Sequence, residues 1–80
     1  LYVHADRLVR DTTDGSSRRT LLALVPQLSA DAPPFGLAIR AWAVIVGNAQ
    51  ALAELIDEGA EPETVAAAAD ELRTVCRPYV

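Results

Sequence analysis

The sequence predicts an all-α fold, either a small four-helix bundle or an orthogonal array of helices. Apolar residues recur at steps of three and four in four separate segments, which is the spacing of one helix face. Proline, glycine and serine mark the boundaries between these segments. The connections are about three to six residues long, as in antiparallel bundles. The expected helices span about residues 1–13, 18–29, 35–58 and 62–77. The short connections favour the bundle, whereas the unequal helix lengths and Pro26 favour the orthogonal array.

The first expected helix, 1–13, has a mainly apolar side and charged residues elsewhere. Leu1, Ala5, Leu8 and Thr12 fall on one side at helical spacing. A short strand over 1–4 is the alternative, because Tyr and Val favour strands. The turn 14–17 follows, and we expect Ser16 or Ser17 to cap the next helix.

The second expected helix, 18–29, contains a proline. Its apolar side consists of Leu21, Leu24, Val25 and Leu28. Pro26 cannot donate a backbone hydrogen bond and its ring collides with the preceding turn. A kink or break near Val25 is therefore predicted.

The longest expected helix, 35–58, is the segment around which the others are organised. Pro33 and Pro34 indicate its start, and Gly59 suits a left-handed residue at its end. One apolar stripe contains Ala38, Trp42, Ile45, Ala49, Leu52 and Ile56. A second, about 100° round the helix, contains Leu37, Ala41, Val44, Asn48, Ala51 and Leu55. Two stripes predict two neighbours for this helix.

The fourth expected helix, 62–77, is clearly amphipathic. Pro62 lies in its first turn and Pro78 ends it. Glu63 lies near its positive end, and Arg73 and Arg77 near its negative end, which matches the helix macrodipole.

The composition favours an apolar surface that needs a partner. The 80 residues make one domain, and 51% of them are hydrophobic. Because they contain no Met, we expect that the start of the chain is missing or that this is a piece of a longer chain. The net charge is −4 and every basic residue is arginine, so no basic stripe predicts a nucleic-acid partner. Arginine without lysine, together with abundant alanine, suggests a GC-rich bacterium or phage.

The central segment is long enough to cross a membrane, but its polar residues argue against that. Arg40, Asn48, Gln50 and Glu54 interrupt it, and a charge at the centre of a span costs about 3 kcal/mol. We therefore expect a buried helix and no membrane partner. One cysteine and no visible signal peptide favour the cytoplasm.

No group of residues predicts catalysis, a metal site or a cofactor. Cys76 lies at a helix C-terminus, where the macrodipole disfavours a thiolate, so we expect a buried apolar residue. His4 has no second and third ligand with which to hold zinc. The carboxylates of residues 54–63 are expected to form a solvated helix end. The protein is therefore predicted not to be an enzyme.

The functional hypothesis is a helical protein–protein interaction module that associates with itself, or with another helical protein, through the central helix. The expected interface residues are Phe35, Leu37, Trp42, Val44, Ile45, Val46 and Asn48. Trp is enriched at binding hot spots, and a polar residue in an apolar stripe can fix register, which is the role considered for Asn48. Substituting Val44 or Ile45 by Asp is expected to abolish association. The alternative is the ligand-binding or dimerisation part of a bacterial transcriptional regulator whose DNA-binding segment lies outside these residues.

Overall fold

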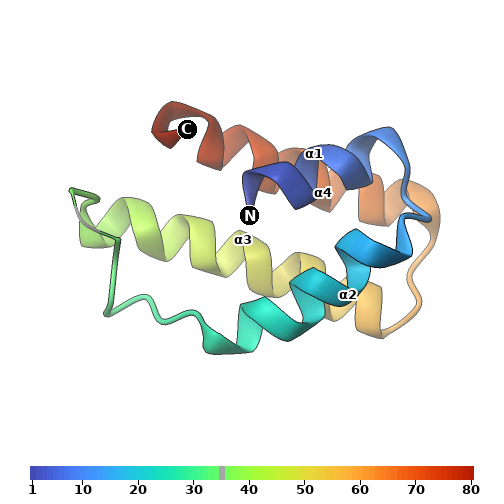
Figure 1. Ribbon diagram of the computed structural model, residues 1–80, viewed down its shortest axis with the longest axis horizontal. Helices are drawn as coiled ribbons and strands as arrows, with labels where there is room; N and C mark the ends of the chain where they lie inside the picture. Colours follow the sequence, from blue (N-terminus) through green and yellow to red (C-terminus); the bar gives the residue numbers. More distant parts are fainter. Residues whose placement is uncertain (35) are drawn as a thin grey trace.

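The computed structural model describes residues 1–34 and 36–80, and it contains four α-helices in that part of the chain. They are α1 (Tyr2–Arg10), α2 (Gly15–Leu24), α3 (Ile39–Asp57) and α4 (Pro62–Cys76) (Figure 1). Short 3₁₀ turns, η1 (Val25–Gln27) and η2 (Arg77–Tyr79), follow α2 and α4. The prediction of an all-α fold is confirmed.

The helices run alternately in opposite directions and form a ring. Each helix contacts the two that flank it in the order α1, α2, α3, α4 and back to α1. In Figure 1, α1 and α2 form the nearer layer and α3 and α4 the farther one. This is the up-and-down arrangement of a four-helix bundle, so the structure agrees with the bundle rather than the orthogonal array.

The first helix ends earlier than predicted. We expected it to reach residue 13, but α1 stops at Arg10 because Asp11 is in an extended conformation. The Asp11 carboxylate then accepts hydrogen bonds from the backbone N–H and the hydroxyl of Thr13, at 3.0 and 2.6 Å. A short polar side chain thus offers the backbone an alternative to another helical turn.

The second helix starts earlier than predicted, and its cap is Asp14 rather than Ser16 or Ser17. The Asp14 carboxylate accepts a hydrogen bond from the Ser17 backbone N–H at 3.2 Å, which is the usual N-cap interaction. At the other end, α2 gives way at Val25 to η1, and Leu28 is extended. The break predicted at Pro26 is therefore confirmed, although the helix expected to reach residue 29 ends five residues earlier, at Leu24.

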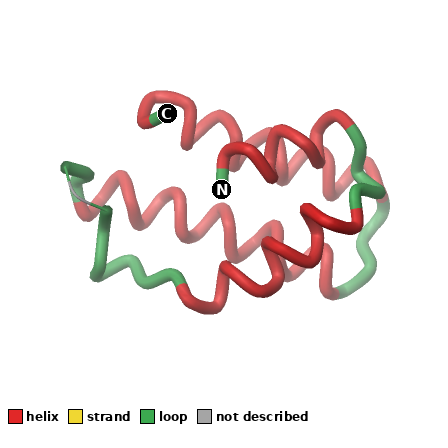
Figure 2. Tube along the Cα trace, in the orientation of Figure 1, coloured by secondary structure: helices red, strands yellow, loops and turns green. Residues whose placement is uncertain are grey.

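The central helix starts four residues later than predicted. Leu37 N–H donates to the Pro34 carbonyl at 3.0 Å, closing a turn in which Gly36 has a φ of 84°. Ala38 is extended, so α3 begins only at Ile39. Pro33 and Pro34 therefore belong to the long connection between α2 and α3, drawn as a loop in Figure 2. Phe35 lies outside the described residues.

The end of α3 and the whole of α4 match the prediction closely. Gly59 has a φ of 72°, and its N–H donates to the Ile56 carbonyl while Ala60 N–H donates to the Leu55 carbonyl. This pair of bonds is a Schellman motif. Pro62 opens α4, and the chain tightens into η2 at Pro78.

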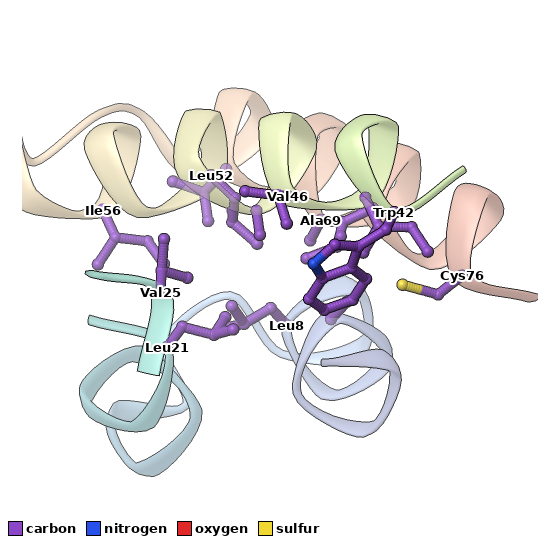
Figure 3. Close-up of a cluster of buried hydrophobic side chains, with 14 residues drawn as sticks. Leu8, Leu21, Val25, Trp42, Val46, Leu52, Ile56, Ala69 and Cys76 are labelled. Atoms are coloured by element: carbon purple, nitrogen blue, oxygen red, sulfur yellow. The ribbon is translucent and has the colours of Figure 1, made fainter. Parts of the chain in front are cut away.

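The core lies on the inner side of α3 and joins all four helices, as Figure 3 shows. Five members of the first predicted stripe are buried, whereas its first residue, Ala38, is exposed. Every member of the second stripe is exposed or half-buried. The buried part of the first stripe is Trp42, Ile45, Ala49, Leu52 and Ile56.

An ion-pair cluster joins the first helix to the last. Arg73 on α4 contacts Asp6 on α1 at 3.0 Å and Asp70 on its own helix at 2.7 Å. Arg10 contacts the other oxygen of Asp6 at 3.0 Å. The hydrogen bond from Arg73 to Asp6, supported by Arg10, holds the pKa of Asp6 below its usual range. Since the pairs are partly exposed, they add orientation more than stability.

The two glycines at the end and in the middle of α3 give a paired prediction. Gly59→Ala forces a left-handed conformation on a residue with a Cβ and should lower the free energy of unfolding by about 1 kcal/mol. Gly47→Ala should raise it by up to about 1 kcal/mol, because a Cβ there meets no atom within 4 Å. Urea unfolding in dilute solution measures both values. Equal signs for the two substitutions would contradict this assignment.

Candidate interaction surface on the central helix

Six of the seven residues predicted for the interface fall into three groups in the structure. Trp42, Ile45 and Val46 are buried in the core of this chain. Leu37 and Asn48 are half-buried, and Val44 is 52% exposed. Phe35 belongs to none of these groups because it lies outside the described residues. The side chains of the buried group are thus already covered within one copy.

Trp42 holds the long connection against α3. Its indole Nε1–H donates to the Ser29 carbonyl at 2.6 Å. The ring lies beside Cys76, in the part of the core farthest from Ile56 (Figure 3). Trp42 is therefore an internal anchor, with its polar edge satisfied by backbone.

Asn48 is satisfied within its own helix. Its side-chain amide donates to the Val44 carbonyl at 2.8 Å. Within the described residues this amide forms no hydrogen bond to another helix, so Asn48 does not fix the register of the four helices in this chain.

The exposed apolar residues of α3 lie on the side of the helix that faces away from the other helices. Ile39 is 61% exposed and Val44 is 52% exposed, and these are the exposed large apolar residues of this helix. We call the nine exposed residues of α3 the outer face: Ile39, Arg40, Ala43, Val44, Gly47, Gln50, Ala51, Glu54 and Asp57. The sequence pattern indicated the polar residues of this face but not its apolar part, because Val44 and Ala51 belong to an apolar stripe with the same spacing as the core stripe.

Gly47 lies at the centre of the outer face. At 100° per residue, Arg40 and Glu54 lie within about 20° of it, two turns before and two turns after. A Cβ at this position would meet no atom from another part of the described chain within 4 Å, so none of these residues requires a glycine here. Glycine nevertheless destabilises a helix interior by up to about 1 kcal/mol relative to alanine.

The charges of the outer face oppose the macrodipole of α3. Arg40 lies in the first turn, near the positive end, whereas Glu54 and Asp57 lie in the last turn, near the negative end. In contrast, α4 has Glu63 in its first turn and Arg73 in its last. Arg40 and Glu54 are about 21 Å apart along the helix, too far to pair with each other. Neither forms an ion pair with any residue in the described part of the chain.

Two shallow grooves flank α3. One, of about 630 Å³, lies between α2 and α3 and includes Leu22, Pro26, Gln50 and Glu54 in its lining. The other, of about 310 Å³, is more apolar and lies at the Trp42 end. Both chain termini line the second groove, together with Leu37, Cys76 and Tyr79.

A His–Ser–Asp cluster at the start of α2 has a structural explanation. His4 Nδ1 lies 3.4 Å from the Ser17 hydroxyl, which in turn lies 3.4 Å from the Asp14 carboxylate. The carboxylate contacts the serine rather than the histidine, so it cannot orient the imidazole as in a catalytic triad. Ser17 is also completely buried. The cluster joins α1 to the capped end of α2.

Cys76 is buried, and burial raises the pKa of its thiol, which disfavours the nucleophilic thiolate. No group of three or more His, Cys, Asp or Glu residues in residues 1–34 and 36–80 could hold a metal ion.

By length and composition α3 could cross a membrane, and 39% of its most apolar window is buried inside the bundle. One such helix is weak evidence for a membrane span, because a mostly buried core helix can have the same length and composition.

Comparisons with protein-family models, curated proteins and solved structures find no match to this chain.

His4 gives a prediction about pH. Burial lowers its pKa, and the positive charges of the amino terminus and Arg7 lower it further, while Asp14 acts in the opposite direction. The unfolded chain, with an ordinary His pKa of about 6.5, therefore binds more protons than the folded chain in the window below that value. The stability linked to neutral His4 is complete above this window and is lost as the pH falls through the folded pKa.

We expect the urea midpoint to decrease between about pH 7.5 and pH 5. His4→Asn should flatten this dependence, because no other group with a lowered pKa titrates there: Asp6 and Asp11 both have their pKa values lowered from an already acidic range. The same slope in the wild type and in His4→Asn would contradict the assignment.

Proposed function

We propose that this protein is a non-enzymatic helical interaction module that associates with a second copy of itself through the outer face of α3. The observation that carries the proposal is the exposure of Ile39 and Val44 on a helix whose other side already forms the core. Isolated exposed apolar residues are ordinary on protein surfaces. These two share one face with Ala43, Gly47 and Ala51, so the exposed apolar surface is contiguous along the first two-thirds of the helix.

This proposal moves the expected interface round the helix. Trp42, Ile45 and Val46 would reach a second copy only if the core opened, since they are buried here. Val44 stays in the proposed interface, with Leu37 and Asn48 at its edge. Non-enzymatic function is supported by the buried thiol and by the arrangement of the His4 cluster around a helix cap.

Val44→Asp tests the proposal, and Val3→Asp is its matched control. Val44 and Val3 are similarly exposed, at 52% and 55%, but Val3 lies on α1, away from the outer face. Introducing a charge at Val44 should abolish association or weaken it at least about tenfold, whereas the same change at Val3 should leave it unchanged. Ile45→Asp is not a clean test because Ile45 is buried.

The measurement is the mass in solution by light scattering after size-exclusion chromatography, with helicity by circular dichroism for each variant. A wild type that stays monomeric at high concentration would contradict the proposal. So would a Val44→Asp variant that associates as the wild type does.

A further inference from the structure

We infer that the second copy packs antiparallel across the outer face of α3, with Gly47 at the two-fold axis and Arg40 of each copy level with Glu54 of the other. This inference rests on the proposed function and adds the geometry of the pair. It follows from two features that the single chain leaves unexplained: the inverted charges of α3 and the glycine at its centre.

The charges select the direction of packing. Arg40 and Glu54 are equidistant from Gly47, each seven residues or about 10.5 Å away along the axis. An antiparallel copy centred on Gly47 therefore brings each Arg40 beside the partner's Glu54, forming two symmetric pairs. A parallel copy would place arginine beside arginine and glutamate beside glutamate. Like charges opposite one another disfavour that arrangement.

The same arrangement compensates the unfavourable interaction between the charged residues of α3 and the macrodipole of that helix. In the single chain, Arg40 faces the positive end of its own helix, and Glu54 and Asp57 face the negative end. An antiparallel partner brings its negative helix end and its acidic residues to Arg40. It brings its positive end to Glu54 and Asp57. Charges that destabilise the isolated helix thus become favourable in the pair.

Gly47 suits the point at which two helices cross. A residue without a side chain lets two helix backbones approach closely, which increases the contacts made by the residues around it. Apart from its own helix backbone and chain neighbours, no atom of residues 1–34 and 36–80 lies within 4 Å of a Cβ at this position, so the glycine leaves room on the outside of the bundle. The exposed Ile39 and Val44 supply the apolar contacts on either side of the charged pairs.

The size of the surface sets the strength of the pair. A 19-residue helix is about 28 Å long and about 10 Å wide, so one helix pair covers less than the roughly 1,200–2,000 Å² of stable interfaces. The pair should therefore be reversible. The experiment must extend from about 10 μM to about 1 mM protein to populate it, since a small interface associates weakly.

Charge reversal tests the register separately from association itself. Arg40→Glu and Glu54→Arg each turn both attractive pairs into repulsive ones, and each should raise the dissociation constant about tenfold. Carrying both substitutions in one chain restores opposite charges across the axis and should restore the affinity. An equimolar mixture of the two single variants should also associate, because both pairs in the mixed dimer are again attractive.

Unfolding of α3 cannot explain a loss of association in the single variants. Arg40→Glu places an acidic residue in the first turn of α3, and Glu54→Arg places a basic residue in the last, so each single substitution favours the isolated helix. Helicity should be unchanged or higher in the variants that lose association. High salt should weaken the wild-type pair, because it screens exposed charges.

Sedimentation equilibrium of the wild type, both single variants, the double variant and the mixture gives three outcomes. Weakened single variants with a restored double variant support the antiparallel register. A wild type that associates while the single variants match it, or while the double variant stays weak, overturns the register but leaves self-association in place. A wild type that is monomeric throughout overturns both proposals.

Discussion

The packing of one apolar stripe of α3 is the contact on which the rest of the structure depends. Leu8 on α1, Leu21 and Val25 on α2 and η1, and Val65 and Leu72 on α4 are buried in the same cluster as this stripe. Each of these helices is short or carries a break, and helices of this length are only marginally stable alone in water. Their order therefore comes from burial against α3. Even the long connection from α2 is tied to it, through the hydrogen bond between Trp42 and Ser29.

Folding of the single chain explains the inner side of α3 but not its outer side. The inner side is apolar and closely covered, as folding demands. The outer side contains a glycine that weakens the helix and charges that oppose its dipole, and neither feature helps the isolated chain. Both become favourable if a second α3 lies across this face. Folding and association would then be linked, since binding that requires the folded state stabilises it.

Local chemistry explains which parts of the fold could be predicted from the sequence. Pro26 and Pro62 each restrict the backbone and Gly59 permits a left-handed conformation, so the break in the second helix, the end of α3 and the start of α4 followed from single residues. The start of α3 depends on Gly36, whose φ of 84° directs the chain into a turn instead of a helix. A proline pair alone does not distinguish a helix start from an ordered loop. We predicted a serine cap for α2 because Asp14 also suits a turn, and a residue in the turn before the helix was not expected to be the cap.

The candidate surface was harder to predict for a related reason. Both apolar stripes of the central segment have the same spacing, so the pattern does not indicate which stripe is buried within the chain. Only the ring of four helices assigns Trp42 and Ile45 to the core and leaves Val44 outside. The charge symmetry of Arg40 and Glu54 about Gly47 was visible in the sequence. Its meaning depends on knowing that all three residues are exposed on one face.

The most direct test of a paired α3 is an isotope-filtered NOE experiment on an equal mixture of ¹³C-labelled and unlabelled protein. In this experiment only contacts between copies give signals. The account predicts intermolecular signals from the methyl groups of Ala43 and Val44 to residues of the partner's α3 near Gly47 and Gln50. Intermolecular signals confined to α4 or to the groove at the Trp42 end would contradict it, as would their complete absence at the highest concentration.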